Sequence, residues 1–364
     1  MRLVIFGLTV SSSWGNGHAT LWRGLIRELG RRGWNVTFYE KDVQYYRDTR
    51  DRNWLEGGEL VLYESWGEVR RRAEADVAAA DAALVTSYCP DGVAASRLVW
   101  ETRSALRVFY DLDTPVTLSQ LKRGNTVNYL PTEGLSPFDL VLSYTGGEAL
   151  DDLHSLLGAR RTAALYGHVD PDVHRPGAAR PEFAGDLSYI GTYAADRQRA
   201  LEALLVEPAR LRPELSFVIA GAQYPHDFPW TENIRFVRHL PPEDHPDFYA
   251  SSRLTLNVTR SDMAAMGWCP SGRLFEAAAC GAAIVTDLWP GLENFFLPGE
   301  EVIGVRLTKD ALEALSISEG ERSRIARNGR ERVLAEHTSA KRAAEFEAIL
   351  SASARTAPAM ALEA

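Results

Sequence analysis

The feature that most constrains this chain is a regular alternation of short β-rich runs with helix-length amphipathic segments. In the first half, the runs that resemble strands are residues 3–6, 36–39, 60–63, 83–86, 106–110 and 140–143. In the second half they are residues 187–190, 217–220, 234–237, 254–258, 283–286 and 302–305. Because strands that alternate with helices pair in parallel, the pattern predicts an α/β protein with parallel sheets.

A stretch spaced with proline and glycine, residues 169–185, interrupts the alternation. A chain of 364 residues also exceeds what one core usually serves, so we expect two Rossmann-like domains joined by a linker. The expected ranges are an N-terminal domain at 1–170, a linker at 171–186, a C-terminal domain at 187–335 and, at 336–364, a helix that packs back toward the N-terminal domain and ends in a frayed tail after Ser351. Helices are predicted at 19–31, 194–206, 271–280 and, as one long helix, from 319 to 350.

Composition narrows the class of protein. Hydrophobic residues make up 45% of the chain and charged residues 24%, which is typical of a globular protein and not of a disordered one. The net charge of −9, without any basic run, argues against nucleic acid as the main partner and against a polybasic membrane anchor.

Targeting and redox signals are weak. The apolar run at residues 3–6 is far shorter than the core of a signal peptide, and no stretch of about 20 apolar residues could span a membrane, so we expect a cytoplasmic protein. Cys89, Cys269 and Cys280 are too few and too widely spaced for a disulfide framework or a close metal-ligand cluster. We expect them to be buried free thiols.

A glycine-containing loop, residues 7–18, separates the first predicted strand from the first predicted helix. Amides at a helix N-terminus attract anions, and glycine lets the backbone approach a ligand closely, so this loop is suited to bind an anion or a sugar. A rival interpretation is a dinucleotide fingerprint with Glu40 or Asp42 as the ribose-binding acid. We disfavour it because the loop is too long for a tight turn and because GNGHAT, from Gly15, lacks the third glycine.

His18 stands at the head of the helix that follows this loop. An imidazole there can take a proton from an acceptor hydroxyl near neutral pH, especially when a carboxylate orients its other nitrogen. Asp111 and Asp113 are candidate orienting groups, because they follow a predicted strand at the sheet edge where ligands of open α/β folds bind. The alternatives are that both aspartates form the turn before Pro115, or that they form an Asp-x-Asp metal motif.

The densest group of candidate residues lies between Asn257 and Asp287. Ser271 is a good helix N-cap, and the backbone amides that follow it can bind a diphosphate. The guanidinium of Arg273 adds a positive charge that can form two parallel hydrogen bonds. Glu276 comes in the second turn of that helix, whose other face is apolar. Its carboxylate could accept hydrogen bonds from both hydroxyls of a ribose, and the alternative is a glutamate that faces solvent.

A family resemblance enters at these residues. The sequence SGRLFEAAACG at 271–281, followed by IVTD at 284–287, resembles the nucleotide-sugar half of GT-B glycosyltransferases, particularly the CgeB-like group. Residues 188–193 with Arg197, residues 165–176 and the Pro-Gly-x-Glu turn at 297–302 resemble further segments of that family.

The resemblance implies a GT-B fold, in which two Rossmann-like domains with parallel sheets face each other across a cleft. It also implies that the C-terminal domain binds the donor nucleotide sugar and that the N-terminal domain binds the acceptor. On the donor side, the implied residues are Gly191, Thr192, Tyr193, Arg197, Gly221, His239, Asn257, Ser271, Gly272, Arg273 and Glu276. On the acceptor side they are Trp14, Gly15, Asn16 and Gly17.

The chemistry implied by the resemblance is a catalytic dyad. His18 with Asp111 or Asp113 resembles the His–Asp dyad of inverting GT-B enzymes. Many retaining relatives carry a Glu-x7-Glu pair, but here Trp268 stands eight residues before Glu276, so the stereochemical outcome stays open.

We therefore predict a glycosyltransferase, specifically a hexosyltransferase, that moves a sugar from a UDP-, dTDP- or GDP-sugar to an acceptor hydroxyl or similar nucleophile, with no metal or other cofactor. Aromatic residues cluster in the first half of the chain and favour an aromatic or glycosidic acceptor. The alternatives are a nucleotide-sugar epimerase of the same fold, an inactive scaffold that binds a nucleotide sugar, and a nicotinamide-dependent dehydrogenase. The donor base and sugar, the acceptor and the oligomeric state stay open at this point.

Overall fold

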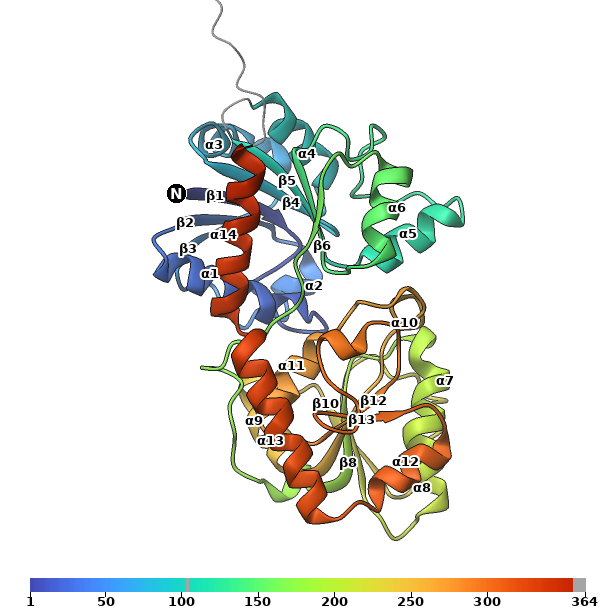
Figure 1. Ribbon diagram of the computed structural model, residues 1–364. Coiled ribbons are helices and arrows are strands. Elements are labelled where there is room, and N and C mark those ends of the chain that lie inside the picture. The colour runs from blue at the N-terminus through green and yellow to red at the C-terminus, as the bar shows by residue number, and fades with distance from the viewer. Residues whose placement is uncertain (103–104, 356–364) are drawn as a thin grey trace, which may run out of the picture. The chain divides into compact units, whose positions relative to one another are not determined.

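The computed structural model describes residues 1–102 and 105–355, which form two compact units (Figure 1). Among the described residues, the first unit comprises Met1–Ser12, those within Trp22–Tyr166, and residues 340–355, and the second comprises Ser13–Leu21 and Gly167–Ser339. Residues 13–21, which were expected in the N-terminal domain, belong to the second unit. The last helix, which was expected to pack back toward the N-terminal domain, belongs to the first unit. Residues 356–364, part of the predicted frayed tail, lie outside the described residues.

The first unit is built on a seven-stranded parallel sheet in the order β3-β2-β1-β4-β5-β6-β7. Its strands are β1 (Arg2–Gly7), β2 (Asn35–Lys41), β3 (Gly58–Tyr63), β4 (Ala82–Thr86), β5 (Leu106–Asp111), β6 (Leu140–Ser143) and β7 (Thr162–Ala164). Its helices are α1 (His18–Arg31, whose first turn belongs to the second unit), α2 (Gln44–Arg47), α3 (Trp66–Ala78), α4 (Gly92–Glu101), α5 (Thr114–Lys122), α6 (Glu148–Leu157) and α14 (Ser339–Arg355). Every strand predicted for this half is confirmed. β7 was missed because its three residues, Thr-Ala-Ala, form no apolar run.

The second unit holds a six-stranded parallel sheet in the order β10-β9-β8-β11-β12-β13. Its strands are β8 (Gly185–Ile190), β9 (Phe217–Gly221), β10 (Ile234–Arg238), β11 (Ser252–Asn257), β12 (Ile284–Asp287) and β13 (Ile303–Val305). Its helices are α7 (Gln198–Leu201), α8 (Glu207–Leu211), α9 (His245–Ala250), α10 (Ser261–Met266), α11 (Gly272–Ala279), α12 (Thr308–Leu315) and α13 (Glu319–Glu336), and its short turns of helix are η1 (Pro181–Phe183), η2 (Ala195–Arg197), η3 (Glu202–Val206, a π-helical turn), η4 (Pro242–Asp244) and η5 (Leu292–Asn294). All predicted strands of this half are confirmed.

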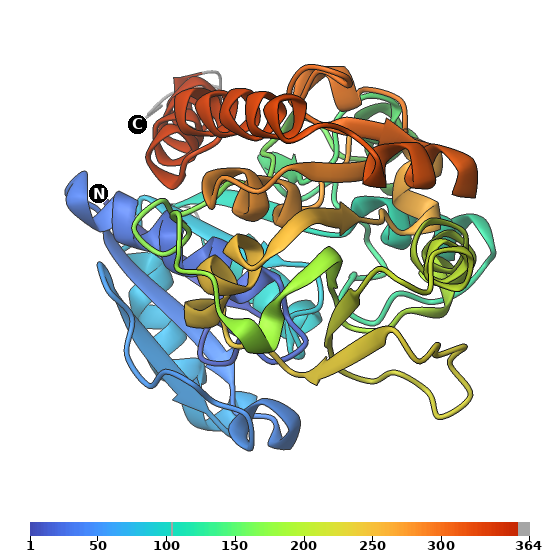
Figure 2. The ribbon, with the colours of Figure 1, turned by 90° about the horizontal axis from the view of Figure 1, so that it is seen from below.

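Helices cover both faces of the second sheet. Figures 1 and 2 show α9, α11 and α13 on one side of it and α7, α8 and α12 on the other. The central strands therefore have no solvated face, which explains why β8 and β9 are rich in buried apolar residues rather than alternating. The predicted α/β class with parallel sheets is confirmed.

Strand order sets where a ligand can enter each unit. The order reverses between β1 and β4 in the first sheet and between β8 and β11 in the second. At such a reversal, the connections on either side leave in opposite directions and open a crevice at the carboxyl ends of the strands. The candidate residues that follow β5, β8 and β11 lie along these carboxyl edges.

The predicted single helix from 319 to 350 is wrong, because it is two helices. α13 ends at Glu336 and α14 begins at Ser339. Val169 lies against the break, donating its N–H to His337 O (2.9 Å) and accepting from Ser339 N (2.8 Å). The backbone groups freed at the break are thus satisfied by a segment distant in sequence, which sequence periodicity could not show.

The last helix also runs further than expected. α14 continues past Ser351 to Arg355, and the carbonyl of its buried Ser353 accepts a hydrogen bond from Arg161 Nη1 (2.9 Å). In the first unit it packs beside the residues that follow α1, where Glu347 accepts hydrogen bonds from Arg32 Nε and Trp34 Nε1, each 2.6 Å (Figure 1). These contacts explain why the helix does not fray where its sequence becomes small and polar.

The structure also bears on the predictions for the cysteines and for membrane-spanning segments. All three cysteines are buried and free, as predicted. Across residues 1–102 and 105–355, no helix combines the length and the apolar character that crossing a bilayer requires.

A fully buried carboxylate fixes the first loop of the first unit. Glu40, near the end of β2, accepts hydrogen bonds from Thr9 Oγ1 (2.8 Å), Val10 N (2.7 Å), Ser11 N (3.0 Å) and Ser11 Oγ (2.5 Å). Its acceptor capacity is committed to the protein, so it is not available to a ribose. Asp42, the other acid of the rival dinucleotide interpretation, is paired with two arginines.

Replacement of this carboxylate should destabilise the first unit. In Glu40→Gln, an amide NH₂ faces donors that a carboxylate oxygen accepted, so we expect the free energy of unfolding in urea to fall by about 2–3 kcal/mol. The exposed Glu56→Gln is the matched control and should change it by less than about 0.5 kcal/mol. Equal stability of the two variants would show that the carboxylate does not hold the loop.

Candidate functional site

The carboxyl ends of β8, β9 and β10 bring three predicted donor residues together. Gly191 follows β8 and donates its N–H to Ala220 O (2.9 Å), and His239, after β10, donates its N–H to Gly221 O (2.8 Å). A Cβ atom on Gly221 would lie 2.0 Å from Gly191 O, so glycine is required by this close approach. The two backbones therefore approach closely at this edge, with the Tyr224 hydroxyl donating to Gly191 O (3.1 Å).

The predicted acceptor loop contributes to the same unit. The ring of Trp14 lies against that of His239, with centroids 4.0 Å apart, and His239 adopts a left-handed backbone conformation (φ 54°). Asn16 Oδ1 accepts the N–H of His18 (3.1 Å) at the first turn of α1, and Gly15 and Gly17 flank Asn16. The structure thus brings a residue predicted on the acceptor side beside one predicted on the donor side.

The N-terminus of α11 has the features of an anion site. Ser271 is the N-cap, and its Oγ accepts the N–H of Arg273 (3.3 Å). Gly272 is the first helical residue. Within the part of the chain that the structure describes, the Arg273 guanidinium makes no hydrogen bond or ion pair. An unengaged cation at the positive end of a helix is well placed to meet a phosphate group.

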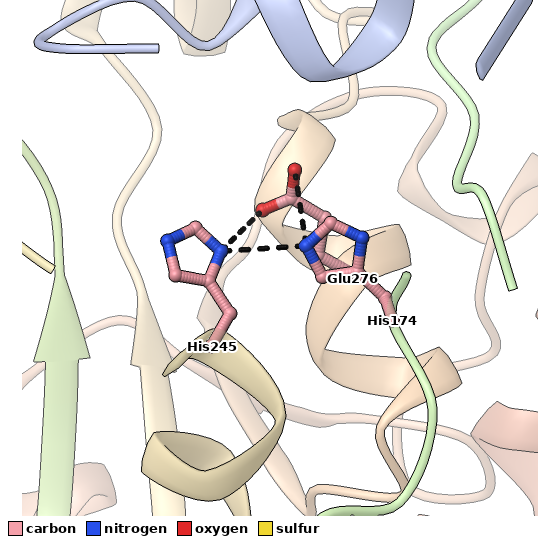
Figure 3. Close-up of side chains that lie close together, drawn as sticks. All are labelled: His174, His245 and Glu276. Atoms are coloured by element: carbon pink, nitrogen blue, oxygen red, sulfur yellow. Dashed lines mark hydrogen bonds and ion pairs between the residues drawn. The ribbon is translucent and has the colours of Figure 1, made fainter. Parts of the chain in front are cut away.

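Glu276, one turn further along α11, points at two histidines (Figure 3). Its Oε1 lies 3.8 Å from His174 Nε2, its Oε2 lies 3.8 Å from His245 Nδ1, and the two imidazole nitrogens are 3.3 Å apart. Thr20 Oγ1 donates to Oε1 (3.2 Å). Glu276 is only 8% exposed, so the alternative of a solvent-facing glutamate is wrong.

The electrostatics of this cluster keep Glu276 ionised. Burial alone would raise its pKa, but His174, His245, Arg273 and the hydroxyl of Thr20 together hold the pKa of Glu276 below its ordinary value. Burial lowers the pKa of His245 to about 4, with Glu276 opposing the shift, so this imidazole is neutral at pH 7.

The remaining predicted donor residues are engaged within the unit. Arg197 of η2 donates to Tyr189 Oη (3.2 Å) and to Thr192 O (3.1 Å), and Tyr193 follows Thr192 in the same loop. Asn257, at the end of β11, is buried and donates to Thr286 Oγ1 of β12 (3.1 Å). These side chains hold the loops of this edge, and their contact with a donor stays a prediction.

The predicted catalytic aspartates lie in the first unit. Asp111 ends β5, is fully buried, and accepts the N–H of Asp113 through Oδ1 (3.1 Å). Burial raises the pKa of Asp111 to about 7. Asp113 caps the start of α5 with its carbonyl, as a turn former before Pro115 would. His18 belongs to the second unit, so its pairing with either aspartate stays a prediction.

A pocket of about 450 Å³ opens in the first unit after β4 and beside α5. The rings of Tyr88 and Tyr129 stand 5.0 Å apart, and the Tyr129 hydroxyl is 2.6 Å from Thr117 Oγ1. Tyr88 has a left-handed backbone (φ 58°), a strained conformation that clusters at functional sites. The lining combines apolar and polar groups, among them Pro90, Val116, Gln120 and Asn128.

Sequence reasoning missed two members of the site. His174 comes from the segment after Gly167, and His245 begins α9. His174 lies in residues 165–176, which the family resemblance singled out without giving this histidine a role, and neither histidine stands at a motif spacing from Glu276. The pocket was anticipated only through the general clustering of aromatic residues in the first half of the chain.

Comparison with known proteins supports the predicted class, a glycosyltransferase. Residues 197–348 match a family described as "Glycosyl transferase-like". Among curated proteins, no sequence matches the chain at a significant level.

Solved structures share the fold across almost the whole chain. Sucrose-phosphate synthase from Thermosynechococcus elongatus is 14% identical, with a TM-score of 0.72 over 98% of this chain and 100% of that one. HepE from Anabaena, in complex with UDP and glucose, is 13% identical, with a TM-score of 0.68 over 97% and 100%. An α-glucosyltransferase in complex with UDP-glucose and DNA containing an abasic site is 12% identical, with a TM-score of 0.67 over 96% and 99%.

These likenesses show that the chain has the GT-B fold, as predicted. The family match and the fold together confirm the predicted class, a glycosyltransferase. The CgeB-like subgroup stays a prediction.

The buried Asp111 should make stability depend on pH. Because its folded-state pKa is raised from 3.8 to about 7, the folded protein binds this proton more tightly, and stability falls as pH rises between those values. Asp111→Asn removes the effect. We expect the variant to gain up to about 4 kcal/mol relative to wild type between about pH 4 and pH 8, as measured by urea unfolding. The exposed Asp48→Asn should show no such gain, and a gain in neither variant contradicts the assignment.

Proposed function

We propose that the protein transfers a hexose from a nucleoside diphosphate sugar to a hydroxyl or similar nucleophile of an acceptor. The observation that carries this proposal is α11, where a capped N-terminus, the unengaged Arg273 and the buried Glu276 follow one another within two turns. UDP-glucose is the first candidate donor, because the structures of HepE and the α-glucosyltransferase contain UDP with glucose or UDP-glucose.

The donor diphosphate would lie at the N-terminus of α11. There the amides after Ser271 and the guanidinium of Arg273 supply positive charge. Negative charge grows on the diphosphate as the bond to the sugar breaks, so the same groups stabilise the transition state and carry out the transfer without a metal ion at the diphosphate. Gly191 and Gly221 let the backbones at the neighbouring strand ends approach each other closely, and Glu276 accepts from the ribose hydroxyls.

The acceptor would bind in the first unit. The pocket of about 450 Å³ has the size of a small-molecule site, and its two tyrosine rings suit a flat aromatic or sugar ring. His18 accepts the proton of the attacking hydroxyl, with Asp113 or Asp111 as the orienting carboxylate. A base of this kind suits a single displacement with inversion at the sugar carbon, which the stereochemistry of the product reports.

A thermal-shift experiment tests the donor site. UDP and UDP-glucose should raise the unfolding temperature, because a ligand at about 100 times its Kd stabilises the folded state by about 2.7 kcal/mol, whereas NAD should leave it unchanged. In Glu276→Gln, loss of a charged acceptor for the ribose should weaken UDP binding by about 1.5–3 kcal/mol, roughly 10- to 150-fold. The matched control is Glu243→Gln, an exposed glutamate of the same unit.

If dTDP or GDP, and not UDP, raises the unfolding temperature, the assignment of the donor base changes and the proposed transfer stands. A response to NAD alone, or no response to any nucleoside diphosphate, would overturn it.

Replacement of His18 tests the base. His18→Ala should lower kcat by about 10²–10⁴-fold while the affinity for UDP stays nearly unchanged, because the imidazole acts on the acceptor and not on the nucleotide. The exposed His226→Ala is the control and should keep full turnover. Full turnover in His18→Ala would remove His18 as the base. Product analysis separates an epimerase, which releases a modified donor without any acceptor, from a scaffold, which binds the donor and does not turn it over.

A further inference from the structure

The proposed function uses the carboxylate of the cluster of His174, His245 and Glu276 and leaves both histidines without a role. The spacing of their atoms is informative. The two imidazole nitrogens are 3.3 Å apart, and each lies 3.8 Å from a carboxylate oxygen. A tetrahedral zinc ion with nitrogen and oxygen ligands at about 2.0–2.2 Å holds its ligand atoms about 3.3–3.6 Å apart. The two nitrogens already have that spacing. The two 3.8 Å distances run to different oxygens of Glu276, and one ligand atom from each residue lies within 4.8 Å of the others, so the carboxylate must move closer to the nitrogens when a metal ion binds.

The hydrogen bonding of His245 directs a lone pair into the cluster. Its Nε2 lies 3.3 Å from the carbonyl oxygen of Leu240. A carbonyl only accepts, so Nε2 carries the hydrogen and Nδ1 carries the lone pair. Metal-ligating histidines are held in the same way, with the outer ring nitrogen donating to a carbonyl or carboxylate. The atom turned toward Glu276 is therefore in the form that binds a metal.

The contact between the two rings is a hydrogen bond, which Nε2–H of His174 donates to Nδ1 of His245 (3.3 Å). Nδ1 of His245 and Oε2 of Glu276 are both acceptors, and they stand 3.8 Å apart where Glu276 is 8% exposed and His174 is 2% exposed. Thr20 donates to the other carboxylate oxygen, Oε1. Metal binding requires the coordinating nitrogen to lose its proton, so a cation here would replace the His174 proton between the same acceptors.

We propose that Nε2 of His174, Nδ1 of His245 and one carboxylate oxygen of Glu276 bind a divalent transition-metal ion, with zinc as the best match to two imidazoles and a carboxylate. The ligands come from three separate segments of the second unit: the chain after Gly167, α9 and α11 (Figure 3). Three protein ligands leave a fourth position open to water or to a donor oxygen. Binding through one oxygen also leaves the other available to a ribose hydroxyl, so this site goes beyond the proposed function without replacing it.

Zinc binding by the full-length protein tests the proposal. The purified protein is stripped with a chelator, freed of it, and titrated with zinc in competition with a chromophoric chelator. We expect one zinc ion per chain, and the cobalt-substituted protein should show the visible absorption of a four-coordinate site. His174→Ala and His245→Ala should each lose more than about tenfold in zinc affinity, whereas the exposed His226→Ala should keep it.

Failure to compete for zinc in the stripped wild type, or wild-type affinity in both His174→Ala and His245→Ala, would overturn the proposal. Circular dichroism checks that the variants are folded. If the variants are not folded, the zinc titration and the cobalt spectrum of the wild-type protein decide whether the metal site exists. UDP binding is measured in the same samples. If the wild-type protein binds UDP and no zinc, the metal site alone is rejected. If it binds zinc and no UDP, the donor site alone is rejected.

Discussion

Parallel pairing of the strands is the constraint on which the rest of the structure depends. Because all strands of a sheet run in one direction, their carboxyl ends collect at one edge, and the loops that follow them meet there. This is how Gly191 comes to donate its N–H to Ala220 O, and His239 to Gly221 O, although these residues are distant in sequence. The N-terminus of α11 opens at the same edge because α11 connects two parallel strands.

Three buried carboxylates show how surroundings decide what an acid can do. Glu40 is saturated by four donors from the first loop and serves the fold. Asp111 accepts the N–H of Asp113, but burial outweighs its hydrogen bonds and raises its pKa to about 7, so it can hold a proton near neutral pH. Glu276 is buried beside two histidines and Arg273, and these keep it charged. A ligand can be recruited by the third environment and not by the first, because only the third leaves charge without full hydrogen bonding.

The fold was largely predictable, because strand and helix periodicities report local structure. The exceptions are instructive. β7 escaped because three small residues carry no pattern, and the division between α13 and α14 escaped because Val169, far away in the chain, satisfies the backbone at the break. Of the candidate site, the placement of Ser271, Arg273 and Glu276 at the start of one helix was predictable, because it follows from capping and periodicity over a few residues. His174 and His245 were not, because nothing in their local sequence relates them to Glu276.

The sequence by itself determined the alternation of strands and helices, the parallel sheets and the helix that presents Arg273 and Glu276, since each of these follows from periodicity and capping over a few residues. Only the tertiary structure decided that Glu276 is buried between two histidines, that Glu40 accepts hydrogen bonds from the first loop, and that Tyr88 and Tyr129 line a pocket. The physical reason is that burial, pairing and charge balance depend on which distant segments meet in space, and no local pattern encodes such a meeting.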